Sequence, residues 1–354
     1  MGATNILPLS LGIIIFSFLV TSILVVPFID FLYKLKLTRR KEGEVRGIKK
    51  SLFDKLHDKK AGTPIGGGIL VIAVVVILFA LLVPLISRLG VKIEASYPPR
   101  KELILIFFTF IMFGVLGFLD DYTKIFGRPR PGALGAAFGL SKRTKFGLQW
   151  VLGFIVGFLL YSWMGISILH VPLIDVSVDI GAAYVPFAAF IVVFFANAFN
   201  FTDGLDGLAS GLLIIYLLTY MIMIVTIGNQ DTLLYVFTSL WIGALGAFLY
   251  FNIWPARIFL GDAGALSFGA MIAVIGLMIG NVATLFIVGG IFVIEAATSA
   301  IQIFGWKLLN RPIFPLAPIH HTFLTIGWEE PKIVMRAWII GILMAIFGLW
   351  LAAI

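Results

Sequence analysis

The sequence predicts an all-α, polytopic integral membrane protein with about ten transmembrane helices. Hydrophobic residues make up 60% of its 354 residues and charged residues only 12%, whereas soluble domains carry about 25% charged residues. A spanning helix needs about 20 mostly apolar residues, and ten segments meet that requirement. Because no polar stretch is long enough for a soluble domain, we expect residues 1–354 to form a single transmembrane domain.

The predicted helices follow the apolar runs in order along the chain. Their ranges are 6–33, 64–88, 102–119, 146–168, 183–199, 209–228, 232–254, 263–281, 283–306 and 335–354. The boundary between the eighth and ninth helices depends on Asn281 alone, which is the one polar break there. The first helix is too long for a signal-peptide core and lacks a basic leader, so we expect it to be retained.

The lysine and arginine residues predict how these helices are oriented. Of the 26, 22 lie in the odd-numbered loops between helices. Because positively charged loops stay on the cytoplasmic side, the odd loops are expected there and both termini on the outer (periplasmic or extracellular) side. The net charge of +8 then reflects this topology and attraction to anionic lipid, or attraction of a phosphorylated substrate, and we expect no nucleic-acid partner.

Five aspartates lie near the ends of apolar runs, all on the predicted cytoplasmic side. They are Asp120 and Asp121 in GFLDDYTK, Asp203 and Asp206 in NAFNFTDGLDGLASG, and Asp262 in IFLGDAGALS. Acids in a membrane protein are costly unless they serve a site, and acids gathered at one face suggest a divalent metal and phosphate chemistry. Neighbours on a helix point about 100° apart, so Asp120 and Asp121 suit different roles, and Lys124 is spaced to neutralise or orient them. Taken singly, each motif also fits an interfacial cap or a turn.

Four polar side chains at three-residue spacing suggest one polar helical face. They are Asn197, Asn200, Asp203 and Asp206. Positions i and i+3 share a helix face, so this row is expected to line a polar cavity. A turn capped by its own side chains is the alternative.

Further polar residues lie on the same predicted side. His320 and His321 follow Pro318 in a proline-rich loop, where they suit metal binding, acid–base chemistry or phosphate binding, or decorate the surface. Lys60 precedes a Gly/Thr-rich helix start, where a lysine and the helix N-terminus can bind phosphate. The alternative is a lysine that only follows the positive-inside rule. Glu295 and Gln302 lie seven residues apart in the ninth apolar run, where an acid marks a site or a paired helix contact.

Four motifs occur in an order that resembles a known superfamily. DDYTK, NxxNFTDGLDGLA, FNxxPAxxFLGDAG and PIHH…GWEEPKIVxRxW are together similar to the motifs of the polyprenyl-phosphate N-acetylhexosamine-1-phosphate transferases, over nearly the whole chain. The KxGTP start at Lys60, the PIHH loop and the EPKIV ending favour the muramoyl-pentapeptide branch over the N-acetylglucosamine branch.

The resemblance implies a membrane enzyme of peptidoglycan synthesis. Members of the muramoyl-pentapeptide branch transfer phospho-N-acetylmuramoyl-pentapeptide from UDP-N-acetylmuramoyl-pentapeptide to undecaprenyl phosphate, giving lipid I and UMP, with Mg²⁺ as cofactor. The resemblance also implies an active site on the cytoplasmic face of the cell membrane, contact with membrane lipid and a homodimer. Residues 1–354 would form a single transmembrane catalytic domain.

The same resemblance assigns roles to residues of this sequence. As catalytic residues it implies Asp120, Asp121, Asp262, His320 and His321, with Asp262 as the metal ligand. As substrate-binding residues it implies Lys60, Lys145, Asn197, Asn200, Asp203, Asp206, Asn252, Phe259, Glu295 and Gln302, with Phe259 stacked on uracil.

The sequence departs from the family pattern at four positions and leaves three alternatives. Thr322 and Leu324 stand where a third histidine and a glutamate are usual, Ile65 replaces a threonine and Ala265 a serine; the aspartates are kept, so we expect activity. One alternative is a UDP-N-acetylglucosamine:undecaprenyl-phosphate N-acetylglucosamine-1-phosphate transferase. A transporter would place its acids in mid-helix, and an inactive scaffold is suggested only by the changed histidine motif.

Overall fold

The computed structural model describes residues 6–39, 60–127, 140–171, 176–226 and 231–353. Ten helices in these ranges are long and apolar enough to cross a membrane, which confirms the predicted number. Parts of the first and third predicted loops, residues 40–59 and 128–139, lie outside the described residues. The long helices are α1 (Ile6–Lys34), α3 (Gly67–Arg88), α4 (Pro99–Phe126), α5 (Lys142–Met164), α6 (Tyr184–Thr202), α7 (Leu208–Thr226), α8 (Thr232–Asn252), α9 (Gly261–Ile279), α11 (Gly290–Phe304, continued by a π-helical turn at Gly305–Leu309) and α13 (Glu330–Ala353).

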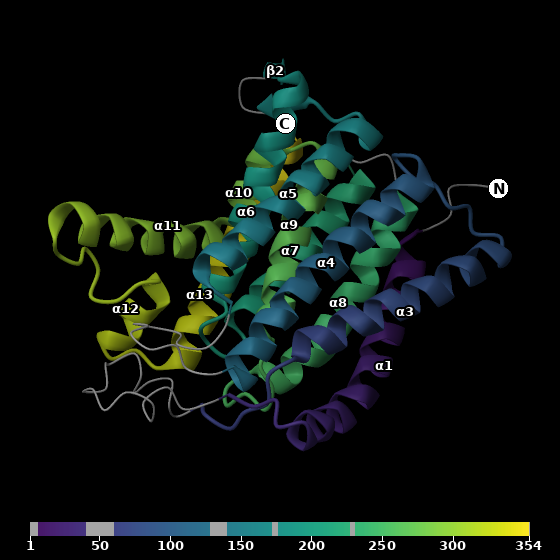
Figure 1. The fold of residues 1–354 in the computed structure, drawn as a ribbon. Coiled ribbons are helices and arrows are strands. Elements are labelled where there is room, and N and C mark those ends of the chain that lie inside the picture. The colour runs from purple at the N-terminus through teal and green to yellow at the C-terminus, as the bar shows by residue number, and fades with distance from the viewer. Residues whose placement is uncertain (1–5, 40–59, 128–139, 172–175, 227–230, 354) are drawn as a thin grey trace.

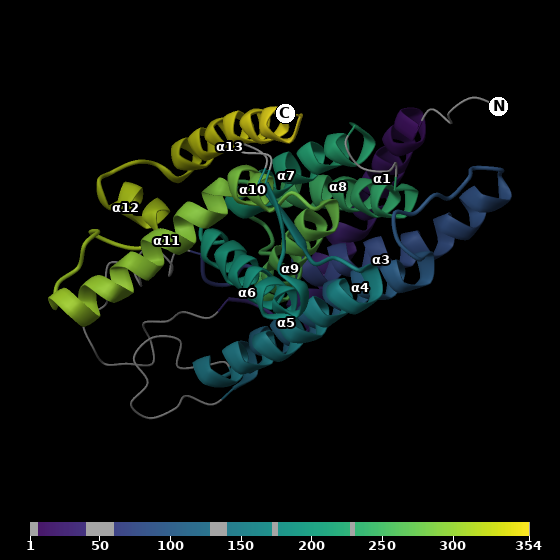
Figure 2. The same ribbon diagram turned by 90° about the horizontal axis from the view of Figure 1, so that it is seen from above.

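Helix α9 lies in the middle of the bundle (Figure 2). It packs against α4 and α6, while α1 covers α8. Nearly every side chain of α8 and α9 is buried, whereas α1 and α13 expose large apolar side chains such as Ile23 and Ile339. Helices that are apolar on all sides are typical of membrane spans, so the chain is a multi-pass membrane protein.

The two ends of the chain lie at one end of the bundle. Helix α1 begins and α13 ends at the upper end in Figure 1, and the aspartate motifs lie at the lower end, called the site end below. An even number of crossings returns a chain to the side on which it started. The common side of the termini therefore agrees with the prediction, while the compartment that this side faces stays a prediction.

Two helix ends differ from the predicted ranges in a way that matters for the site. Helix α4 continues to Phe126, so Asp120 and Asp121 lie within its last two turns and not at its end. Helix α13 begins at Glu330 rather than residue 335, because Pro331 is compatible with a first helical turn. Both corrections extend helices into segments that their charged residues had marked as loop.

The predicted ninth helix, 283–306, is broken. The short helix α10 (Val282–Val288) ends at Gly289, and α11 starts directly after it. A Cβ at Gly289 would lie 2.8 Å from the Phe195 ring, so the break lets the chain pass close to α6. Helix α11 then extends sideways, away from the bundle, towards the short helix α12 (Ile319–Thr325) (Figures 1 and 2).

In the described part of the chain, a two-stranded sheet interrupts the predicted all-α architecture. Strands β1 (Ile168–Val171) and β2 (Val176–Asp179) form an antiparallel hairpin, with His170 paired to Ser177. The hairpin is followed by a 3₁₀ turn, Gly181–Ala183, that leads into α6. Each strand has only four residues, too few for the sequence pattern to distinguish from a loop.

Glycines allow α3 and α4 to approach the start of α9 closely. A Cβ on Gly117 of α4 would collide with the Asp262 carbonyl oxygen, and a Cβ on Gly68 of α3 with the Gly264 backbone. Only the absence of side chains permits these contacts. The N-terminus of α9, and Asp262 with it, is therefore held against the turn of α4 that carries the two aspartates.

Candidate active site

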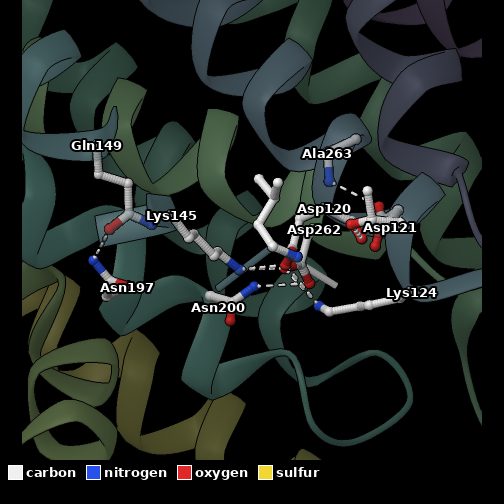
Figure 3. A network of polar contacts seen from close by, with 11 residues as sticks. Asp120, Asp121, Lys124, Lys145, Gln149, Asn197, Asn200, Asp262 and Ala263 are labelled. Carbon is white, nitrogen blue, oxygen red and sulfur yellow. Dashed lines mark hydrogen bonds and ion pairs between the residues drawn. The ribbon is translucent and has the colours of Figure 1, made fainter. Parts of the chain in front are cut away.

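Asp120 and Asp262 share two lysine ammonium groups. Lys124 Nζ lies 3.0 Å from Asp120 Oδ2 and 2.7 Å from Asp262 Oδ2. Lys145 Nζ donates to Asp120 Oδ2 over 2.9 Å and also to Asp262 Oδ2. The Leu140 amide donates to the other Asp120 oxygen over 2.9 Å. Residues from α4, α5 and α9 thus meet in one charged cluster (Figure 3).

Asp121 points to another part of the same site. Its Oδ2 accepts a hydrogen bond of 3.1 Å from the Ala263 amide, in the first turn of α9. This confirms that the adjacent aspartates have different surroundings (Figure 3). Lys124 pairs with Asp120 across one helical turn, as its spacing predicted.

The spacing predicted that the four polar residues from Asn197 to Asp206 share one helix face. This prediction is wrong, because α6 ends at Thr202. Asn200 donates to Asp262 Oδ1 over 3.2 Å, whereas Asn197 donates to Gln149 over 2.8 Å. Asp203 caps the C-terminus of α6. Its pKa is raised to about 7 by burial and by the charge of Asp262, against the opposing cations Lys60 and Arg39.

Asp206 belongs to a second cluster. Lys60 Nζ donates to Asp206 Oδ1 and to Glu330 Oε1. The Asp206 amide donates to the same Glu330 oxygen over 2.6 Å, and the Ala256 amide donates to Asp206 Oδ2 over 2.9 Å. This arrangement joins the start of α3, the turn after α6, the turn after α8 and the start of α13.

Asn252 and Phe259 shape the chain between α8 and α9. Asn252 accepts from Ser210 Oγ over 2.8 Å and donates to the Ile258 carbonyl over 3.0 Å. The Phe259 backbone bonds with the segment before α3, and the Arg39 guanidinium lies 5.6 Å from the centre of its half-buried ring. These contacts hold the loop that leads to Asp262.

The histidine pair lies in helix α12, not in an irregular loop as predicted. Both side chains are buried, with 1% and 4% exposure for His320 and His321. His320 Nδ1 lies 2.9 Å from Glu295 Oε2, and the His320 ring lies against Gly204, in the turn after α6. The His320 ring therefore lies beside the turn that carries Asp203 and Asp206.

A cleft of about 470 Å³ opens beside the second cluster. Its walls include Lys60, Gly204, Trp254, His321, Trp328 and Glu330. Two indole rings, a cation and an acid suit a ligand with a flat ring and polar edges. Gln302 lies elsewhere: it bonds with the backbone of Ile313 and Phe314, which stabilises the segment before α12.

The aspartate cluster fits a magnesium ion that is completed by substrate. Among the described residues no three His, Asp or Glu side chains form a ready metal site. Magnesium, however, is commonly held by one or two carboxylates together with substrate phosphates and water. Asp120 and Asp262 already converge on cations, the two ammonium groups, and the Asn200 amide nitrogen donates to the second oxygen of Asp262.

Two residues of these networks were not identified from the sequence. Gln149 of α5 bonds Asn197, and Glu330 joins Lys60 to the Asp206 turn. Glu330 stands within the EPKIV motif, but an acid next to Glu329 gave no sign of a partner 270 residues away. A salt-bridge partner so distant in sequence cannot be inferred from local spacing.

The chain is similar to a well-defined group of proteins. Residues 103–280 match the model of glycosyl transferase family 4. A phospho-N-acetylmuramoyl-pentapeptide-transferase of Geobacillus sp. (strain WCH70) is 35% identical over 96% of both chains. The protein of that name from Geobacillus kaustophilus (strain HTA426) is 36% identical over 95% of both chains. The one from Staphylococcus aureus (strain bovine RF122 / ET3-1) is 35% identical, covering 83% of this chain and 87% of that protein.

Proposed function

The chain belongs to glycosyl transferase family 4 and, within it, to the phospho-N-acetylmuramoyl-pentapeptide transferases, and on that premise we propose a complete reaction for its site. It is a membrane-bound transferase of peptidoglycan synthesis, and nothing in the comparisons favours the N-acetylglucosamine alternative. The donor is UDP-N-acetylmuramoyl-pentapeptide, the acceptor is undecaprenyl phosphate, and the products are lipid I and UMP. The observation that carries the proposal is the joining of Asp120 and Asp262 by two lysines at one end of the bundle.

The reaction is a displacement at phosphorus. An acceptor phosphate oxygen forms a bond to the donor phosphorus that carries the sugar. The bond from that phosphorus to the bridging oxygen breaks, and UMP leaves with this oxygen. Because a phosphate is already a good nucleophile, the protein contributes positioning and neutralisation of charge.

The carboxylates divide this work. Asp120 orients the acceptor phosphate or takes its proton. Asp262 would hold Mg²⁺, which would supply charge neutralisation for the donor pyrophosphate. Asp121, fixed by the start of α9, shares the metal or supports Asp120. Lys145 and Lys124 provide ammonium groups that contact the substrate phosphates.

The cleft beside Lys60 receives the rest of the donor. Phe259 stacks on uracil, and Asn252, Asp203 and Asp206 hold the walls of the nucleotide site. His320 and His321 contact the donor phosphates or sugar from α12. Asn197 acts indirectly, through its hydrogen bond to Gln149 of α5. Gln302 also acts indirectly, by holding the backbone before α12.

The polyprenyl acceptor requires the site to lie at a membrane surface. The site end of the bundle carries the aspartates, and we assign it to the cytoplasmic face because described basic residues such as Lys34, Lys124 and Lys142 lie at the helix ends on that side. Both termini are then outside, and residues 1–354 work as one catalytic domain. The homodimer implied by the family resemblance is part of the proposal.

The test is an assay of the purified protein with both substrates and Mg²⁺, following UMP release. We expect UMP with the muramoyl donor and none with UDP-N-acetylglucosamine; the reverse would move the protein to the sister branch. A covalent phospho-sugar aspartate, seen as exchange between donor and UMP without acceptor, would contradict the single displacement.

A further inference from the structure

We propose that Glu330 is a positioning residue for donor recognition, acting through Lys60. The inference rests on the proposed function and adds to it a residue of the EPKIV motif to which the family resemblance assigned no role. Glu330 is the second residue of a pair of glutamates at the start of α13. Its side chain is only 9% exposed, whereas Glu329 next to it is exposed.

Glu330 fixes the ammonium group of Lys60. Lys60 is 13% exposed and its Nζ lies 2.5 Å from both Asp206 Oδ1 and Glu330 Oε1. An ammonium group has three N–H donors, and these contacts use two of them. One donor remains for a ligand in the cleft that Lys60 lines.

Glu330 also fixes the turn that carries Asp206. The Asp206 amide donates to the same Glu330 oxygen that Lys60 contacts. One carboxylate oxygen therefore sets the position of a side chain before α3 and of the backbone after α6. Gly204 and Leu205 of that turn line the cleft as well, so a change at Glu330 alters two walls at once.

The flexibility of the lysine side chain explains why a second acid is needed besides Asp206. Lys60 lies 5.6 Å from the centre of the Trp254 ring, and a flexible lysine loses much side-chain entropy when it is held in one place. Two carboxylates hold it where a single one leaves more freedom. A fixed donor loses less entropy when the substrate binds, so Glu330 strengthens donor binding without touching the reacting phosphorus.

The experiment compares steady-state kinetics of wild type, Glu330→Ala, Glu330→Gln and Glu329→Ala. We expect Glu330→Ala to raise the donor KM about tenfold, with the acceptor KM and kcat within about threefold. Glu330→Gln keeps an oxygen that accepts both hydrogen bonds, so it should restore the donor KM to within about threefold of wild type. Glu329→Ala removes the same charge from the same wall of the cleft and should change the donor KM far less.

A cycle with Lys60→Met tests whether Glu330 acts through Lys60. In that background Glu330→Ala should add less than about twofold to the donor KM, because the group that it positions is gone. If Glu330→Ala is too unstable to purify, Glu330→Asp, which shortens the side chain, replaces it with the same expectation. Thermal unfolding of each variant accompanies the kinetics.

Several results would overturn the inference. They are an unchanged donor KM in Glu330→Ala, an equal rise in both substrate KM values, an equal effect of Glu329→Ala, and full additivity with Lys60→Met. Absence of UMP release by wild type would instead overturn the proposed function. The two failures are therefore distinguishable.

Discussion

The two ends of helix α4 carry buried acids in opposite surroundings. At the site end, Asp120 is 2% exposed and contacts two ammonium groups and a backbone amide. At the other end, Glu102 is fully buried, and neither of its carboxylate oxygens has a hydrogen-bond partner among the described residues. At one end of α4, two ammonium groups and an amide can stabilise a charged carboxylate. At the other end, the carboxylate has no hydrogen-bond partner among the described residues.

The surroundings of Glu102 extend this contrast. Its neighbour Asp231 caps α8, accepting from the amides of Leu234 and Ser96 over 2.9 Å each. Tyr97 donates to the Met278 carbonyl over 2.7 Å, and burial together with the acids Glu102 and Asp231 raises the pKa of Tyr97 to about 12. These contacts tie loops to helix ends and leave no cation among them. Burial therefore does not distinguish Asp120 from Glu102, whereas the two ammonium groups beside Asp120 do.

The largest effect should follow from Asp262→Asn, which removes a carboxylate at the site end of the bundle. Loss of a metal ligand and of the charge that pairs Lys124 and Lys145 should lower kcat at least a thousandfold, about 4 kcal/mol. The protein should still be extracted as a single species. Retention of more than about a tenth of wild-type activity at saturating Mg²⁺ would show that Asp262 is not the principal ligand.

A smaller loss is expected when one of the shared cations is removed. Lys145→Met leaves Asp120 and Asp262 with Lys124 alone and should reduce kcat/KM about tenfold to a hundredfold. Lys142→Met is the matched control, because Lys142 is an exposed lysine one turn earlier in α5 and should stay within about twofold of wild type. Equal effects of the two changes would mean that only the general positive charge matters.

The histidine pair should contribute less than the lysines. We expect the double change His320→Ala and His321→Ala to raise the donor KM or lower kcat by more than about threefold, over ~0.7 kcal/mol. If both constants stay within that range, α12 only connects α11 to α13. Glu295→Gln, which keeps a hydrogen-bond acceptor for His320, serves as the milder comparison.

The smallest effect is expected at Glu102, at the end of α4 that lies away from the site. Glu102→Gln keeps the shape of the side chain and removes a charge that would be costly to bury unpaired. Turnover should stay within about twofold of wild type, and the Tm should be unchanged or higher. A large loss of turnover with an unchanged Tm would show that the far end of α4 takes part in the reaction.

The sequence alone predicted the number of spanning helices and one contact at the site end of α4, but nothing about Glu102 at the other end. Apolar runs of spanning length identified ten helices, and the i to i+4 spacing predicted the Lys124–Asp120 contact. Polar spacing failed between Asn197 and Asp206, because α6 ends at Thr202 and its following turn sends Asp206 to Lys60. The break at Gly289 and the contact of Glu330 with Lys60 depend on packing between segments far apart in the chain, which no local pattern contains.

The proposal that Asp262 is the metal ligand is tested most directly by Mn²⁺ binding in the presence of the donor, measured by electron paramagnetic resonance. We expect one ion per wild-type chain, a loss of affinity of at least about tenfold, ~1.4 kcal/mol, in Asp262→Asn, and wild-type binding in Glu102→Gln. Undiminished binding in Asp262→Asn, or loss of binding in Glu102→Gln, would contradict it.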